Sequence, residues 1–279
     1  MSRVAIVRGT EPPEMTVKAL EMVDAFAAIP AEKSVLIKPN YINTEHPSTG
    51  ITTDSRVIEG VVKFLRHRGV KEIIIGEGTG FGDTIQAFKV AGVDAVAERW
   101  NVRLVDLNKD EYVEVRPRNP LAMKKVKIAK TVLESTIISV PKLKPHRMAG
   151  VTLSLKNMMG AMTPKASMHT SLSKNIVDLA SVIGPRVAII DGIIAGEGHE
   201  TSGNPVEMNL VIAGTDPVAV DTVGAAVMSI SPEAVKHLRL AEEHGLGTCS
   251  LERIQILGEP LEKVRRKFRT SFVTKLLQI

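Results

Sequence analysis

The stretches "SVLIKPN" (34–40) and "KEIIIGEG" (71–78) each place an apolar, β-branched run directly before polar residues. Between them lies an amphipathic segment at 54–68. Uninterrupted apolar runs are typical of parallel strands that are covered on both faces. Together the three segments read as a strand–helix–strand unit, which predicts an α/β fold.

The same alternation continues along the chain, and we predict an α/β protein with mainly parallel β-sheet flanked by helices. A weak pseudo-repeat leaves two readings open, because "KPN" and "PKLKPH" each follow an apolar strand. The domain at 1–260 either contains two similar lobes, 1–130 and 135–260 with a cleft between them, or the likeness is coincidental. Further strands are expected at 4–7, 102–107, 135–142, 186–193 and 209–216, helices at 15–28, 83–98, 171–183, 217–228 and 231–244, an excursion or hairpin at 110–130, and a basic helical tail at 261–279.

Composition excludes several classes of function. Aromatic residues make up only 3% of the chain, too few for base stacking, so nucleic-acid binding is not expected despite a net charge of +5. Cys249 is the single cysteine and ligates neither zinc nor an iron–sulfur cluster alone. The N-terminal apolar run is too short for a signal peptide, and no stretch reaches the length of a membrane span. We therefore expect a cytoplasmic protein that does not bind membranes.

Polar residues follow most of the expected strands. The carboxyl ends of parallel strands meet at one edge of a sheet, where ligands usually bind. Their shared position therefore predicts one common site. The residues are Lys38 and Asn40 after the second strand, Glu77 after the third, Lys142, Lys144 and His146 after the fifth, Asp191 after the sixth and Asp216 after the seventh.

The stretch "VPKLKPHRMAGVTLSLKNMMGAM" (140–162) carries several basic side chains and no acidic one. We expect Lys142, Lys144 and Lys156, with Lys38 and Arg147, to bind a phosphate or carboxylate group. The alternative is that Lys142 and Lys144 point outward into water.

Lys156 and Asn157 stand among apolar and small residues. Burial lowers the pKa of a lysine, which suits a general base or an imine-forming amine. The alternative for Lys156 is an ordinary lysine that reaches from a helix to solvent.

The stretch "IIIGEGTGFGDT" (73–84) invites comparison with a dinucleotide-binding loop. The required third glycine is Phe81 in one register and Asp83 in the other, so the fingerprint fails. Gly78 and Gly80 still permit close approach of the backbone, either to a phosphate or to another loop.

Three histidines, His146, His169 and His199, lie in predicted loops beside the site, with Asp191 and Glu197 nearby in sequence. They are candidates for general acid–base catalysis or, if distant loops assemble, for metal binding. His67, His237 and His244 are expected at the surface.

Two aspartates stand in "AGTDPVAVDTVGAAVM" (213–228). Asp216 also fits the N-cap of a helix that begins with proline. Asp221 is a carboxylate among small residues and is expected to need a partner, for which one of the lysines is a candidate.

Taken together, "VLIKPN" with the following "TTD", the 140–162 stretch, "IIDGIIAGEG" with "SGNP", and "AGTDPVAVDTVGAAVM" with "HGLG" resemble domain-of-unknown-function family 362. The resemblance covers roughly residues 34 to 257, and His169 before "LSKNIVDLA" resembles the family's histidine. Many members carry a ferredoxin-like segment with iron–sulfur motifs. This chain, with one cysteine, departs from that pattern, so a redox role does not carry over.

Two hypotheses follow. The first is an enzyme acting on a phosphorylated or carboxylated small molecule, or using a nucleotide-like cofactor. The second is a non-catalytic accessory or cofactor-delivery protein working with an iron–sulfur or redox partner. The candidate catalytic residues are Lys156, His146, His169, Asp191 and Glu197, and the candidate binding residues are Lys38, Asn40, Lys142, Lys144, Asn157, Gly78, Gly80 and Asp216.

Overall fold

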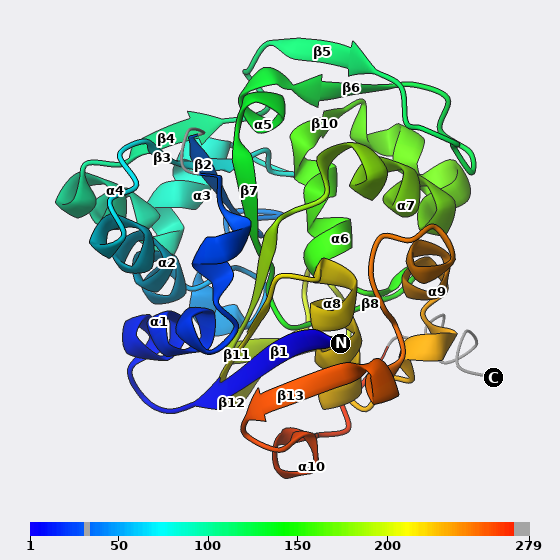
Figure 1. Ribbon diagram of the computed structural model, residues 1–279. Coiled ribbons are helices and arrows are strands. Elements are labelled where there is room, and N and C mark those ends of the chain that lie inside the picture. The colour runs from blue at the N-terminus through cyan, green and yellow to red at the C-terminus, as the bar shows by residue number, and fades with distance from the viewer. Residues whose placement is uncertain (31–33, 271–279) are drawn as a thin grey trace.

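A computed structural model of the chain describes residues 1–30 and 34–270. Its centre is one eight-stranded sheet in the order β13-β1-β12-β11-β7-β2-β3-β4 (Figure 1). The strands are β1 (Ser2–Arg8), β2 (Val35–Pro39), β3 (Ile73–Glu77), β4 (Arg103–Asp106), β7 (Thr136–Val140), β11 (Val187–Glu197), β12 (Asn204–Gly214) and β13 (Ile254–Gly258).

The sheet is mixed but mostly parallel. Five neighbouring pairs are parallel, and β12 alone runs antiparallel to both of its neighbours, β1 and β11. The predicted α/β class with mainly parallel sheet is therefore confirmed. Because β2, β3, β4 and β7 run in the same direction, their carboxyl ends lie at one edge and bring the residues that follow them together.

Helices cover both faces of the sheet, as the continuous apolar strands require (Figure 1). Alternate residues face opposite sides: Leu36 and Ile74 belong to one apolar cluster, whereas Ile37 and Ile75 belong to the other. The cluster with Ile37 and Ile75 is covered by four helices, α1 (Pro12–Met22), α2 (Ser55–His67), α3 (Thr84–Ala91) and α4 (Val93–Trp100). The cluster with Leu36 and Ile74 is covered by α6 (Ser154–Asn157), α7 (Leu172–Ile183), α8 (Pro217–Val227) and α9 (Lys236–Glu243).

Smaller elements complete the fold. The 110–130 segment contains the antiparallel strands β5 (Tyr112–Val115) and β6 (Val126–Ala129), so the hairpin reading is confirmed. These strands join β10 (Met162–Thr163) in a second sheet beside α7 (Figure 1). The other bounds are α5 (Lys130–Glu134), β8 (Pro145–His146), β9 (Gly150–Val151) and α10 (Leu261–Val264), with short 3₁₀ helices η1 (Ala25–Ala28), η2 (Pro47–Thr49), η3 (Met158–Ala161), η4 (Lys165–Ser171), η5 (Pro232–Ala234) and η6 (Leu251–Arg253).

The structure departs from the predictions in three places. The helix expected at 83–98 is divided into α3 and α4 by Gly92, whose φ of 75° ends the first helix. The expected halves 1–130 and 135–260 share the central sheet, because β2 pairs with β7 and β1 with β12, so two lobes are not seen. The tail is helical only in α10 among its described residues, and 271–279 lie outside the described part.

No helix in residues 1–30 and 34–270 combines the length and apolarity needed to cross a bilayer.

Candidate functional site

A cavity of about 450 Å³ opens beyond the carboxyl ends of β2 and β3, where α6, η4 and the loop after β11 meet them. Its walls come from four regions that are far apart in the sequence, 38–42, 77–81, 144–169 and 199–201. The polar side chains that line it are Lys38, Asn40, Glu77, Lys144, His146, Arg147, Lys156, Asn157, Lys165, His169, His199 and Glu200, and Gly78, Gly80 and Gly160 supply backbone.

The floor of the cavity is a buried ion pair between Lys38 of β2 and Glu77 of β3. Lys38 Nζ lies 2.6 Å from Glu77 Oε1, and both side chains are buried. The other carboxylate oxygen accepts a hydrogen bond from Tyr41 N at 3.0 Å, and Oε1 also accepts one from Gly78 N at 2.8 Å. Burial lowers the pKa of Lys38, an effect that Glu77 opposes. The neighbouring strands β2 and β3 thus position the two charges opposite each other.

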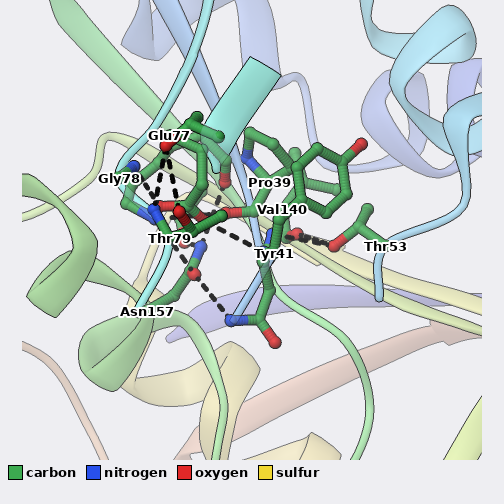
Figure 2. A network of polar contacts seen from close by, with 12 residues as sticks. Pro39, Tyr41, Thr53, Glu77, Gly78, Thr79, Val140 and Asn157 are labelled. Carbon is green, nitrogen blue, oxygen red and sulfur yellow. Dashed lines mark hydrogen bonds and ion pairs between the residues drawn. The ribbon is translucent and has the colours of Figure 1, made fainter. Parts of the chain in front are cut away.

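Asn157 at the end of α6 ties this pair to the rest of the site (Figure 2). Its amide nitrogen donates to Lys38 O at 3.0 Å and to Ser139 Oγ at 3.1 Å. Its amide oxygen accepts from Lys38 Nζ and Asn40 Nδ2, each at 3.3 Å. These bonds fix Lys38, Asn40 and Asn157 as one rigid polar network.

The glycines bring loops together. A Cβ on Gly160 would overlap Glu77 Oε1 and lie 2.8 Å from Lys38 Nζ. A Cβ on Gly78 would overlap the carbonyl of Gly160, and one on Gly80 would lie 2.6 Å from Ile42 Cδ1. Of the two readings for Gly78 and Gly80, the structure therefore shows close approach to other loops.

Lys144 and Lys156 are the two lysines of the 140–162 stretch that reach the cavity. Lys144 Nζ donates to the carbonyls of Ile51 at 2.8 Å and Glu200 at 3.0 Å. Lys156 Nζ has no hydrogen-bond or ion-pair partner among the described residues. Burial and the charge of Lys156 lower the pKa of Lys144 to about 7, and burial lowers the pKa of Lys156 to about 8.

Glu200 gathers the basic groups on the opposite wall. One of its carboxylate oxygens lies 3.1 Å from Arg147 Nε and 3.6 Å from His146 Nε2, and the other lies 4.0 Å from His199 Nε2. His146 Nδ1 accepts from the backbone N–H groups of Met148 and Ala149, so the ring carries its proton on Nε2. Burial, with the charge of Lys156, lowers the pKa of His146 and keeps the ring neutral.

The short helix η4 contributes Lys165 and His169 to the rim. Lys165 Nζ donates to Asn108 Oδ1, and burial lowers its pKa. His169 Nδ1 lies 3.4 Å from the carbonyl of Ala166, at an exposed position.

Four candidates from the sequence lie outside the cavity lining. Lys142 and Asp191 form a completely buried ion pair of 2.6 Å, and Asp191 also accepts from Asp54 N and Ile193 N. Glu197 accepts from Arg269 N at 2.9 Å, and Asp216 caps α8 and accepts from Ser2 Oγ. These carboxylates at strand ends bind the fold together and do not face the cavity.

Two further expectations are corrected. The partner of Asp221 is the backbone, because its oxygens accept from Ser154 N at 2.7 Å and Leu155 N at 2.9 Å at the start of α6. Burial raises the pKa of Asp221 to about 8. His237 is fully buried where a surface position was expected, and burial lowers its pKa to about 3.

Sequence reasoning missed Glu200 and Lys165. Glu200 follows Glu197 by three residues in "GEGHETSGNP" (196–205) and directly follows His199, so its place beside a candidate histidine was a usable signal. Lys165 gave no signal, because only the fold brings η4 over the cavity. Within the described part of the chain, no group of three or more His, Cys, Asp or Glu residues is placed to hold a metal ion.

Comparison with known proteins shows which family the chain belongs to. Residues 35–226, more than half of the chain, match the family described as domain of unknown function DUF362. The chain belongs to this family. It is also 25% identical over 241 residues to the thylakoid-associated protein sll1697 of Synechocystis sp., an alignment that covers 82% of this chain and 74% of that protein. The matched family region contains β2, β3, β7, α6 and all of the cavity-lining residues.

Proposed function

We propose that the DUF362 cavity binds a small molecule carrying a phosphate or carboxylate group, and that the protein is an enzyme acting on that molecule. The observation that carries the proposal is the charge of the lining. Five cations, Lys38, Lys144, Arg147, Lys156 and Lys165, share one cavity with two carboxylates, Glu77 and Glu200, a formal excess of three positive charges.

The excess is concentrated on a few side chains. Glu77 neutralises Lys38 and Glu200 neutralises Arg147, so Lys144, Lys156 and Lys165 remain without a carboxylate within 4.0 Å among the described residues. Lys144 is buried and Lys156 and Lys165 are half-buried, so each loses hydration without gaining a carboxylate partner, which is costly. An anionic ligand supplies the missing negative charge and forms charge-assisted hydrogen bonds with the amines.

The same residues supply groups for proton transfer. The pKa of Lys156, about 8, lies close to neutrality, which is where a general acid or base works best. His146 presents its Nε2 proton toward Glu200 and remains neutral, which suits a hydrogen-bond donor better than a base at neutral pH.

Isothermal titration calorimetry with sulfate and with inorganic phosphate tests the proposal. We expect one binding event in the wild-type protein and an affinity lower by about tenfold or more in Lys156→Met, since a hydrogen bond to a charged group contributes about 1.5–3 kcal/mol. Lys63→Met, which removes an amine from an outer ion pair with Glu14, is the matched control and is expected to bind normally. Absence of binding to the wild-type protein would overturn the proposal and favour the accessory role.

A further inference from the structure

The Lys156 amine differs from the other lysine amines of the cavity. Lys38 is held by Glu77, Lys144 by two backbone carbonyls, and Lys165 by the amide oxygen of Asn108. Lys156 Nζ lines the same cavity and makes no such bond among residues 1–30 and 34–270. Its lone pair, once the amine is deprotonated, is therefore not shielded by a neighbouring donor or acceptor.

The backbone that carries Lys156 is firmly positioned. Asp221 of α8 accepts hydrogen bonds from Ser154 N and Leu155 N, the first amides of α6. At the other end, Asn157 is bonded to Lys38 and to Ser139 of β7. The amine thus projects from a fixed turn into a cavity large enough for a small metabolite.

The cavity offers one set of amines to bind an acidic group and a separate amine, Lys156, that can react. Lys144 donates to two backbone carbonyls and Lys165 to the amide oxygen of Asn108, and neither has a carboxylate within 4.0 Å among the described residues, so both can donate to an acidic group of the ligand. Lys156 is the remaining amine with no competing bond, and burial lowers its pKa to about 8, so about a tenth of it is uncharged at pH 7 and about half at pH 8. An uncharged, unhindered amine is the form that attacks a carbonyl carbon.

From this geometry we propose that Lys156 forms an imine with the carbonyl group of the bound anion, so that the ligand is a phosphorylated or carboxylated aldehyde or ketone. This rests on the proposed function and names the substrate class of the same cavity. Lys156 is accordingly a catalytic residue, and Lys144 and Lys165 hold the acidic group of the ligand.

The step is balanced without a further reactant. The neutral Lys156 amine attacks the carbonyl carbon, a C–N bond forms, and the carbonyl oxygen takes up the proton that the nitrogen loses, which gives a carbinolamine. The nitrogen lone pair then forms the C=N bond while the C–O bond breaks and the hydroxyl leaves with a solvent proton as water. The protonated imine that results loses a proton to solvent, so one amine and one carbonyl yield one imine and one water.

Reductive trapping tests this inference. The probe is pyridoxal 5′-phosphate, a phosphorylated aldehyde, added below the protein concentration and reduced with sodium borohydride before peptide mass spectrometry. We expect the label on Lys156, protection from labelling by sulfate, and a labelling rate that rises with pH through about 8. Lys156→Arg keeps the positive charge and should still bind sulfate while losing the label, and Lys63→Met should be labelled like the wild type.

Two failures are distinguishable. If wild-type protein binds sulfate by calorimetry but the label is spread over surface lysines, the imine inference is wrong and the anion-binding proposal stands. If sulfate neither binds nor protects Lys156, the proposed function itself is wrong, and the imine inference falls with it.

Discussion

At the scale of single residues, the site is built from charges whose partners come from distant segments. Lys38 and Glu77 are separated by 38 intervening positions, yet strand pairing brings Nζ and Oε1 to 2.6 Å. A buried ion pair contributes little net stability, but removing one partner leaves the other charge buried and uncompensated. The pair is therefore costly to break.

Lys38→Met is expected to lower the free energy of unfolding by about 3–5 kcal/mol, because it leaves the Glu77 carboxylate without its counter-charge. Denaturant titration followed by circular dichroism measures the change. Lys63→Met, in an outer pair with Glu14, should change it by only about 0–1 kcal/mol. Equal stabilities for the two variants would contradict the role of Lys38 as the counter-charge of buried Glu77.

Gly160→Ala tests the close packing over this pair. The added methyl group would overlap Glu77 Oε1, so we expect loss of stability together with weaker sulfate binding. Gly9→Ala is the matched control, since its nearest neighbour would be Met15 Cγ at 3.3 Å and it lies away from the cavity. Unchanged sulfate affinity in Gly160→Ala would show that this glycine does not shape the site.

The residues that line the cavity could be predicted from the sequence better than the ion pairs that they form. Nine of the thirteen candidates named from the sequence line the cavity, because basic, amide and glycine residues after apolar strands are a local signal. Lys142 and Asp191 lie outside the cavity lining as an ion pair, which could not be predicted because two residues that follow separate strands give no indication that they neutralise each other. Glu200 was missed although it directly follows the candidate His199.

At the scale of elements, the one-turn helix α6 depends on a cap from another helix. Asp221 sits in the middle of α8 and accepts from the first two amides of α6, whereas Asp216 caps its own helix by accepting from Ala219 N. The first cap positions Lys156 and the second does not. Similar chemistry thus has different consequences for the site.

Asp221→Ala leaves two buried N–H groups without an acceptor, so we expect a loss of about 1–3 kcal/mol in unfolding free energy together with weaker sulfate binding. Asp216→Ala should also destabilise the protein but leave sulfate affinity unchanged. Thermal unfolding and calorimetry on the two variants separate the effects. If both variants bind sulfate normally, Asp221 has no role in positioning the site.

The positions of strands and helices could be predicted from the sequence better than the contacts between residues. Every expected strand is present, because most of them are continuous apolar runs that favour burial on both faces, although β4 at the edge of the sheet is only half-buried. The break between α3 and α4 could not be predicted, because Gly92, in a left-handed conformation, interrupts a continuous amphipathic pattern. The helix α6 could not be predicted either, because its single turn is too short to show a helical repeat of apolar residues. The antiparallel pairing of β12 with β1 and β11 depends on long-range contacts, so no local sequence pattern predicts it.

At the scale of the whole molecule, the basic cavity couples ligand binding to protonation. The pKa values of Lys144 and Lys156, about 7 and about 8, are lowered from 10.5 in the folded chain. Between pH 7 and 10.5 the folded protein therefore binds fewer protons than the unfolded chain, so these lysines make stability rise with pH in that window. A bound anion favours the charged amines and opposes this trend.

Sulfate affinity should accordingly fall as pH rises from 6 to 9, because Lys144 and Lys156 lose their protons while sulfate keeps its charge. Calorimetry in buffers of different ionisation enthalpy should detect proton uptake on binding near pH 8. The double variant Lys144→Met, Lys156→Met should show neither trend. A pH-independent affinity in the wild-type protein would place the anion elsewhere.

The most direct test is the crystal structure of the protein soaked in selenate, a sulfate analogue whose selenium is located by anomalous scattering. We expect an anomalous peak inside the cavity, within hydrogen-bond distance of Lys156 Nζ and beside Lys144. Peaks confined to the outer surface, with the cavity occupied by water alone, would contradict it.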